Sequence, residues 1–324
     1  MPPPRPLLLE RKLLPKVWGG RALEHVLGLR LPLGEAIGET WELFDRPEGS
    51  SRVRDNSTTL AQVLQEDPAA WLGSGVSTGY GGRFPLLVKF LDTKEALSVQ
   101  VHPDDEQAQV EGDGGKNEVW VVLHAGKNAR IIRGLRPGVD LARFRAGAHT
   151  AAVEPMLFSF TPRVGDTVHV PPGTVHSIGP NVVVFELQQN SDVTYRLYDW
   201  GRSREVQVEK ALAVMRPDEG SGAVDRPVVP PQTLPDGGKL LITTKHFRLR
   251  RYELARPYTL ATDRQFATVT VVGGRGILGW HSGGVDTPMQ LMLGDTVLIP
   301  ACVSEVFVSP IGRLEVLVAS PGGA

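Results

Sequence analysis

One short pattern occurs twice in this chain, and it constrains the fold more than any other feature of the sequence. Gly165 begins GDTVHVPPGTVHSI, and Gly294 begins GDTVLIPACVSEVF. Both copies share Gly-Asp-Thr-Val, and Pro171 of the first copy matches Pro300 of the second. Each copy lies late in its own series of short apolar segments, as expected when one structural unit is duplicated. The repeat therefore predicts two β-barrel units of related structure.

The segments around both copies have the composition of β-strands joined by tight turns. They are short, rich in β-branched residues, and separated by Gly and Pro, of which the chain has 36 and 26. Apolar residues make up 41% of the chain and charged residues 22%, which is typical of a globular protein with a packed core. We expect an all-β-dominated fold. The first series of predicted strands is FPLLVKFLD, ALSVQVH, NEVWVVLHA, ARIIRGL, MLFSFTP, DTVHVPPG and NVVVFELQQ.

The chain divides at a segment rich in Pro, Gly and Asp. Residues 216–238 have the composition of a linker. Residues 1–215 are then expected to form an N-terminal segment with the first β unit, and residues 239–324 the second. The first copy of the repeated pattern has His176 where the second has Glu305. We therefore expect the chemistry in the first unit.

Three segments interrupt the strands with helical patterns. In residues 58–73, Thr58 or Thr59 is a suitable N-cap, and the apolar residues that follow recur at helical spacing. This segment is the main helical element that the sequence predicts. Shorter helices are expected within residues 21–31 and 139–150.

Charge and cysteine content exclude several classes of protein. The net charge of −1 does not favour binding to nucleic acid or to an anionic membrane surface. No apolar run is long enough to span a bilayer. The single cysteine, Cys302, excludes an internal disulfide and fits a reducing cytoplasm. We expect a cytoplasmic protein, and the sequence favours no particular oligomeric state.

One predicted strand carries polar side chains on a single face. In ALSVQVHPDD, alternation places Ser98, Gln100 and His102 on the same side, directly before Pro103. Amide and imidazole groups grouped in this way can bind a metal or form hydrogen bonds in an otherwise apolar strand.

GDTVHVPPGTVHSIGPN resembles the second signature of the cupin superfamily, and Gln100-x-His102 resembles the first, with Glu118 as its acidic residue. The resemblance implies two cupin-like (jelly-roll) β-barrels, of which the second is degenerate and has no metal ligands. It also implies one metal ion per subunit, bound by Gln100, His102, Glu118 and His176. This set of ligands suits Zn²⁺, and other divalent first-row ions fit it too.

Four segments in order, LSVQVHPDD, GKNEVW, VPPGTVHSIG and ELQQNSDVTYRLYDWGR, are similar to the short bacterial form of the type I phosphomannose isomerases. The resemblance extends to about residue 204. It implies a zinc-dependent isomerase that interconverts mannose 6-phosphate and fructose 6-phosphate through a cis-enediol. It also implies that Arg196 and Lys116 are catalytic and contact the substrate, and that Ser98 contacts the phosphate.

The residues allow other interpretations. Arg196 could instead pair with Asp192 or Asp199, and Lys116 and Glu118 could be solvated. Glu186 and Gln188 could support the metal ligands or only cap the barrel. Structural roles are expected for His124 and His169, and no partners for His25, His149, His246 and His281. An isomerase for another phosphosugar and a non-catalytic cupin that binds a sugar phosphate remain alternative functions, whereas a cupin dioxygenase fits less well because Gln100 replaces a histidine.

Overall fold

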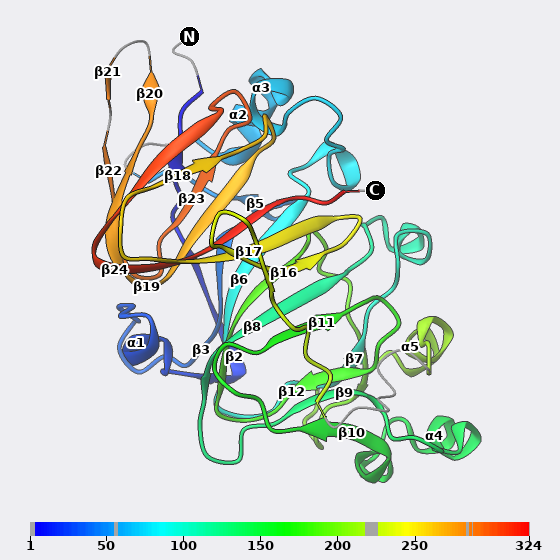
Figure 1. Cartoon of the computed structure of the whole chain (residues 1–324). Helices are drawn as coiled ribbons and strands as arrows, with labels where there is room; N and C mark the ends of the chain where they lie inside the picture. Colours follow the sequence, from blue (N-terminus) through cyan, green and yellow to red (C-terminus); the bar gives the residue numbers. More distant parts are fainter. Residues whose placement is uncertain (1–3, 55–57, 218–225, 283–284, 287, 324) are drawn as a thin grey trace.

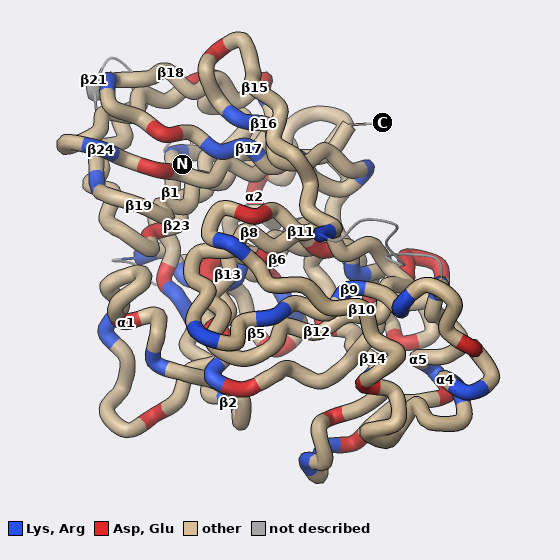
Figure 2. Tube along the Cα trace, turned by 60° about the horizontal axis from the view of Figure 1, so that its bottom comes forward, with Lys and Arg blue, Asp and Glu red and all other residues tan. Residues whose placement is uncertain are grey.

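The computed structural model describes residues 4–54, 58–217, 226–282, 285–286 and 288–323. Every strand pair within these residues is antiparallel, and two groups of sheets lie side by side (Figure 1). Positive and negative residues are interspersed along the chain (Figure 2). None of the described helices has the length and apolar character needed to span a bilayer.

The first group consists of two sheets that pack face to face. One sheet has the order β11 (Thr167–Val170), β8 (Glu118–Ala125), β13 (Val182–Gln189), β6 (Leu86–Thr93), β2 (Lys12–Gly20) and β3 (Ile37–Leu43). The other has the order β10 (Leu157–Phe160), β9 (Ile131–Leu135), β12 (His176–Ile178), β7 (Val99–Val101) and β14 (Tyr195–Tyr198). Trp120 and Val122 of β8 share one buried cluster with Ile131 and Ile178 of the opposite sheet.

Alternation along β13 divides its side chains between two cores. Val183, Phe185 and Leu187 contribute to the large core between this sheet and the second β unit. Val182 and Val184 point into the space between the two sheets. A strand buried on both faces is predominantly apolar, which explains the run VVVFEL.

The second group is one long, branched sheet. Its main order is β1 (Leu7–Leu8), β23 (Thr296–Ile299), β19 (Ala267–Gly279), β24 (Glu305–Pro321), β17 (Phe247–Leu254), β16 (Lys239–Thr243) and β15 (Gln232–Thr233). In addition, β18 (Tyr258–Ala261) pairs with β24, and β22 (Met289–Leu291) pairs with β19. The long strands β19 and β24 pair with different neighbours along their lengths, and their inward residues enclose an apolar core. Two small hairpins complete the strands: β4 (Asp45–Arg46) with β5 (Gly49–Ser50), and β20 (His281–Ser282) with β21 (Val285–Asp286).

The two copies of the repeated pattern have the same local structure. Gly165 and Gly294 adopt left-handed φ angles of 90° and 84°, which glycine tolerates best. The next residue is an aspartate in both copies, and its carboxylate accepts a hydrogen bond from the backbone N–H three residues earlier. A strand follows in each copy, β11 in the first and β23 in the second. The repeat therefore marks one turn used twice.

The helices lie outside the sheets, and α4 and α5 flank the five-stranded sheet (Figure 1). Thr59 is the N-cap of α2 and forms a capping box with Gln62. The segment predicted as one helical element contains two short helices, because Asp67 and Pro68 end the first and begin the second. The sequence did not predict α5. The helices are α1 (Leu23–Val26), α2 (Leu60–Glu66), α3 (Pro68–Leu72), α4 (Leu141–Gly147), α5 (Val208–Val214) and the 3₁₀ turns Tyr80–Gly82, Gln107–Glu111 and Ala151–Met156.

The structure differs from the predicted closed barrels and bears only partly on the predicted linker. Pairing among the described strands closes neither unit into a barrel. In the first unit, consecutive strands such as β7 and β8 belong to opposite sheets, so the connection crosses between layers instead of extending one sheet into a cylinder. In the predicted linker, residues 218–225 lie outside the described residues, and β15 pairs with β16. The division into domains stays a prediction.

Candidate functional site

Three neighbouring strand ends bring the predicted site residues together between the two sheets. Gln100 lies directly opposite His176 in the pairing of β7 with β12. Gly173, with a φ of 85°, reverses the chain before β12, and its N–H donates to the carbonyl of His102 at 2.9 Å. Glu118 begins β8 in the facing sheet. The turn PPGT therefore places His176 beside Gln100 and His102.

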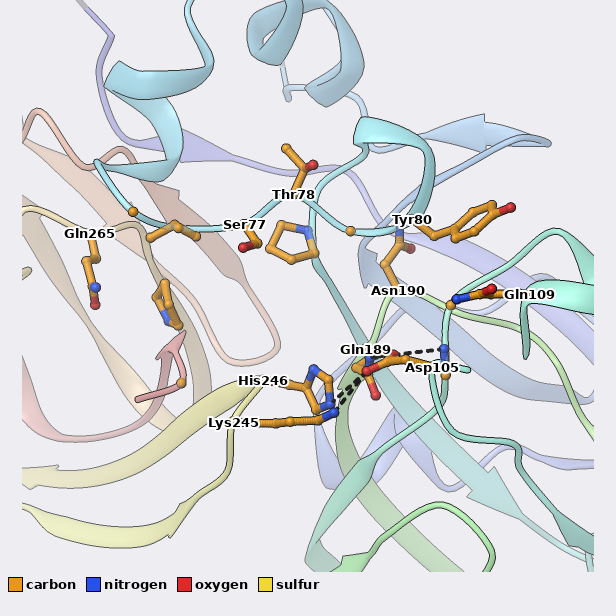
Figure 3. A pocket seen from close by; sticks show the side chains of 18 residues that line it. Ser77, Thr78, Tyr80, Asp105, Gln109, Gln189, Asn190, Lys245, His246 and Gln265 are labelled. Atoms are coloured by element: carbon orange, nitrogen blue, oxygen red, sulfur yellow. Dashed lines mark hydrogen bonds and ion pairs between the residues drawn. The ribbon is translucent and has the colours of Figure 1, made fainter. Parts of the chain in front are cut away.

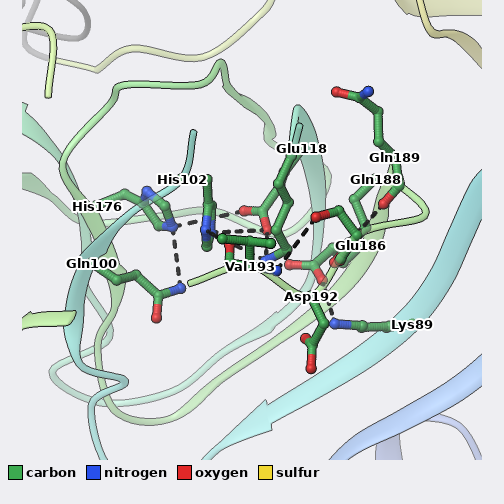
Figure 4. A network of polar contacts seen from close by, with 12 residues as sticks. Lys89, Gln100, His102, Glu118, His176, Glu186, Gln188, Gln189, Asp192 and Val193 are labelled. Carbon is green, nitrogen blue, oxygen red and sulfur yellow. Dashed lines mark hydrogen bonds and ion pairs between the residues drawn. The ribbon is translucent and has the colours of Figure 1, made fainter. Parts of the chain in front are cut away.

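Two histidines and a glutamate form a compact buried cluster (Figure 4). His102, Glu118 and His176 are each 1% exposed, and one ligand atom from each lies within 4.8 Å of the others. The Nε2 atom of His102 is 3.3 Å from Glu118 Oε1, and that of His176 is 3.8 Å from Glu118 Oε2. Glu118 Oε2 is buried without a hydrogen-bond partner. This unpartnered oxygen fits a metal ligand, and the three side chains could hold an ion.

The backbone fixes how both imidazole rings are oriented. His102 Nδ1 lies 2.8 Å from the carbonyl oxygen of Val193, and His176 Nδ1 lies 2.9 Å from that of Thr174. A carbonyl oxygen can only accept, so Nδ1 must carry the proton in each ring. The lone pairs on both Nε2 atoms therefore face the cluster, as in bound metal sites.

The electrostatic environment keeps the three groups in the protonation state that a metal requires. Burial and the charge of Lys116 lower the pKa of His102. Burial, together with His102, lowers the pKa of His176 to about 3. Burial acts to raise the pKa of Glu118, but Lys116 and His102 hold it well below its usual range. Two neutral imidazoles and one carboxylate result.

Lys116 and Gln100 also contact the cluster. The ammonium group of Lys116 lies 3.1 Å from His102 Nε2 and forms an ion pair with Glu118. A positive charge thus already lies against His102 Nε2 and against Oε1 of Glu118. Gln100 directs its amide nitrogen to His176 Nε2 at 3.2 Å, and its oxygen accepts from Ser98. The ligand role of Gln100 therefore stays a prediction.

A cavity of about 210 Å³ opens beside the cluster and contains the predicted substrate residues. Arg196 lies opposite Gln100 in the pairing of β14 with β7. Among the described residues, Arg196 forms no ion pair with Asp192 or Asp199, and its buried Nε has no partner. Asp199 is instead held by its neighbours Arg202 and Arg204. The cavity is lined by Lys16, Trp18, Glu39, Lys89, Leu91, Leu97, Ser98, Gln100, Lys116, Glu186, Asp192, Thr194, Arg196 and Arg204.

Sequence reasoning missed a charged group on the floor of this cavity. Lys89 is only 3% exposed and lies 3.6 Å from Glu39 and from Glu186, with its ammonium 5.1 Å from the Trp41 ring centre. Burial acts to raise the pKa of Glu39, but Lys89 and Lys16 lower it to about 2. A lone lysine in the apolar run LLVKFL was the available signal, because a buried charge needs partners.

Glu186 and Gln188 have different roles, although they share a face of β13. The indole N–H of Trp120 donates to Glu186 at 2.8 Å. Burial and the charge of Glu118 raise the pKa of Glu186 to about 7. Gln188 donates to the carbonyls of Gln189 and Ser191 and so caps the turn after the strand.

A larger cavity, of about 570 Å³, lies where the two β units meet (Figure 3). Its charged groups include Asp105, whose carboxylate contacts Lys245 at 3.1 Å and His246 at 3.6 Å. The expectation that His246 has no partner is therefore wrong. Its lining includes no second histidine or glutamate beside His246, so the smaller cavity is the better candidate for chemistry.

Other histidines lie away from the cluster. The rings of His25 and His124 meet edge to face with centres 5.6 Å apart, and those of His281 and Phe307 with centres 5.0 Å apart. The expectation that His25 and His281 have no partners is therefore wrong too. His169 lies 2.8 Å from the amide oxygen of Asn117.

Comparisons with known proteins all point to one family. The family model for the catalytic domain of phosphomannose isomerase type I matches residues 7–118. The chain is 31% identical to the mannose-6-phosphate isomerase ManA of Bacillus subtilis over 315 residues, covering 93% of this chain and 94% of that one. It is 30% identical to the mannose-6-phosphate isomerase of Streptococcus mutans, covering 91% and 92%. The crystal structure of a mannose 6-phosphate isomerase from Bacillus subtilis aligns with a TM-score of 0.83 and 30% identity, over 98% of this chain and 99% of that one.

Proposed function

Because this chain belongs to the type I phosphomannose isomerase family, we propose that it interconverts mannose 6-phosphate and fructose 6-phosphate through a cis-enediol. The observation that carries this proposal is the buried cluster of His102, Glu118 and His176 beside a cavity that also contains Lys116 and Arg196. The family supplies the reaction class, and the cavity supplies the groups that such a reaction needs.

The proposed metal is Zn²⁺, one ion per subunit, held by Gln100, His102, Glu118 and His176. Imidazole nitrogen and carboxylate oxygen are ordinary zinc ligands. When bound, the ion would act as a Lewis acid on the oxygens of the sugar. Rotation of the Gln100 amide would be needed to present its oxygen, because its nitrogen now faces His176.

The proton that moves between C1 and C2 requires an acid–base group in the cavity. Lys116 is one candidate because its ammonium group lies beside His102 and Glu118. Glu186 is the other, because a pKa raised to about 7 suits a carboxyl group that exchanges protons at neutral pH. Measuring Lys116→Ala and Glu186→Gln separately distinguishes them. The variant that lacks the proton-transferring group should have a kcat about 100-fold or more below that of wild type.

The phosphate of the substrate needs cationic and hydroxyl groups at the cavity. We assign it to Arg196, Arg204 and Ser98, all of which line the cavity. A guanidinium group presents a planar fork of N–H donors that matches phosphate oxygens. In the described chain, Arg196 makes no ion pair that the substrate would have to break.

We propose further that the two β units descend from one duplicated cupin-like jelly roll, and that only the first carries a metal. The face-to-face sheets of the first unit are consistent with a jelly roll. The exposed single cysteine, Cys302, fits the proposed location in a reducing cytoplasm.

The deciding experiment measures conversion of mannose 6-phosphate to fructose 6-phosphate before chelation, after chelation, and after Zn²⁺ is added back. Activity that disappears on chelation and returns with zinc supports the proposal. If the metal-loaded protein converts another phosphosugar and not mannose 6-phosphate, the proposed substrate is wrong. If the metal-loaded protein binds phosphosugars but converts none, it is a binding protein and not an isomerase.

A further inference from the structure

An arginine outside the predicted site forms a buried bidentate ion pair near it. Arg46 lies in β4 and is 8% exposed. Its Nη1 and Nη2 atoms donate to the two carboxylate oxygens of Asp113 at 2.9 and 2.6 Å. Nη1 also donates to the carbonyl of Asn190 at 2.7 Å. Paired forks of this kind are among the strongest and most directional polar contacts in proteins.

The two partners of Arg46 belong to the two segments that frame the cluster. Asp113 lies in the loop 103–117, which leads from His102 to Glu118 and includes Lys116. Asn190 begins the turn 190–194 after β13. Arg46 therefore contacts both segments at once, although it lies far from each in the sequence.

The turn 190–194 acts directly on a metal-ligand candidate. The carbonyl of Val193 accepts the Nδ1–H of His102 at 2.8 Å and so fixes the ring with Nε2 toward the cluster. The backbone N–H of Asp192 points to the same Asp113 carboxylate at 3.4 Å. The contacts run from Arg46 through Asp113 and the turn to His102.

We propose that Arg46 is a positioning residue, which ties the turn 190–194 to the loop 103–117 and thereby holds His102 and Glu118 in their metal-binding arrangement. The proposal rests on the metal site proposed above. Groups that hydrogen-bond a metal ligand typically change metal affinity or activity 10–100-fold when they are replaced. For His102 this group is the Val193 carbonyl, and Arg46 acts on it through the turn 190–194. An ion pair that only stabilised the fold would not have that effect.

The chain offers a matched control. Arg11 forms a similar fork with Glu42, with Nε–Oε1 and Nη2–Oε2 distances of 3.0 and 3.2 Å. Glu42 is more buried than Asp113, Arg11 is more exposed than Arg46, and neither member of the control pair lines the cavity. Arg46→Met and Arg11→Met therefore remove comparable contacts, one connected to the cluster and one not.

The experiment compares the Zn²⁺ dissociation constant, measured by competition with a chelator, in wild type, Arg46→Met, Arg46→Lys and Arg11→Met. Arg46→Met is expected to weaken zinc binding about 10–100-fold. Arg46→Lys, which keeps the charge and loses the fork, should weaken it less, and Arg11→Met should leave it within about twofold. The kcat of the Arg46 variants, measured in parallel, should also fall.

Equal zinc affinity in Arg46→Met and Arg11→Met would overturn the proposal and leave Arg46 as a structural residue. Where Arg46→Met does not fold, Arg46→Lys and Asp113→Asn are judged against the control by the same criterion. A wild-type chain that binds zinc but does not convert mannose 6-phosphate refutes the proposed substrate and leaves this test intact. A wild-type chain that binds no divalent metal refutes both proposals.

Discussion

The repeated turn at Gly165 and at Gly294 leads into two very different interiors. In the first unit, β12, the next strand after β11, pairs His176 with Gln100. In the second, the corresponding strand β24 pairs Glu305 with Ala261, and both of these residues are exposed. The second unit thus has a charged surface residue where the first has a buried imidazole.

The residue paired with the last position of β11 is also polar in the first unit, and its counterpart beside β23 is apolar. In the first unit, β11 pairs Val170 with Glu118 of β8. In the second, β23 pairs Ile299 with Ala267 of β19. Glu118 is a candidate ligand, whereas Ala267 contributes to an apolar core that also includes Val269, Val316 and Trp280.

This comparison separates what the backbone provides from what the side chains provide. One turn, with the same glycine conformation and the same aspartate hydrogen bond, supports a polar cavity in one unit and a packed apolar interior in the other. The fold supplies positions, and the side chains at those positions determine the chemistry.

The most severe test exchanges the residues that distinguish the two units. His176→Glu gives the first unit the residue of the second. It replaces an imidazole oriented by the Thr174 carbonyl with a second buried carboxylate beside Glu118, so zinc binding should weaken by about 10–100-fold and turnover should fall by at least about 100-fold. Its matched control, Glu305→His, changes an exposed residue and should alter neither. Isomerase assays and chelator competition measure both. Zinc bound normally by His176→Glu would break the comparison.

A second exchange tests the apolar interior. Leu298 occupies the place of His169 in the second copy, and its side chain is fully buried in the central core. Leu298→His should destabilise the protein by about 3 kcal/mol, because it removes packing and buries a polar ring without a partner. Zinc affinity should be unchanged. Denaturant unfolding measures the loss of stability. If Leu298→His lost zinc affinity at normal stability, the idea that the second unit has no part in metal binding would be wrong.

The reciprocal exchange, His169→Leu, should have the smallest effect and should depend on pH. Burial and the charge of Arg133 lower the pKa of His169 to about 4, whereas the unfolded chain titrates near 6.5. The unfolded state therefore binds the proton more readily between these values, and the contribution of His169 to stability is lost as pH falls from about 6.5 toward 4. The difference in melting temperature between wild type and His169→Leu should shift in favour of the variant over this range. If the difference in melting temperature stayed constant with pH, the lowered pKa of His169 would be refuted.

The sequence predicted the site best where its residues are close together in the chain. Gln100 and His102 are two residues apart, as are Lys116 and Glu118, and the structure brings all four close to His176. The repeated pattern predicted two β units of related structure, and the structure shows that both use the same turn. These features depend on local spacing, which a sequence displays directly.

Features that depend on contacts between distant strands were missed. Lys89 belongs to the site only because β6 lies beside β13 and β3, and Arg46 only because β4 lies against the loop 103–117. The expectation of closed barrels failed for the same reason, since strand order is not visible in the alternation of one strand. A search for lone charges in apolar runs would have found Lys89 but not Arg46.

The pairing of β1 with β23 has a consequence for how the protein is made. Leu7 lies opposite Leu298, so two segments that are far apart in the sequence pair with each other. Contacts of such long sequence separation form late and slow folding. Until β23 has been synthesised, residues 7–8 have no partner strand in this sheet, and their apolar edge is open to other chains.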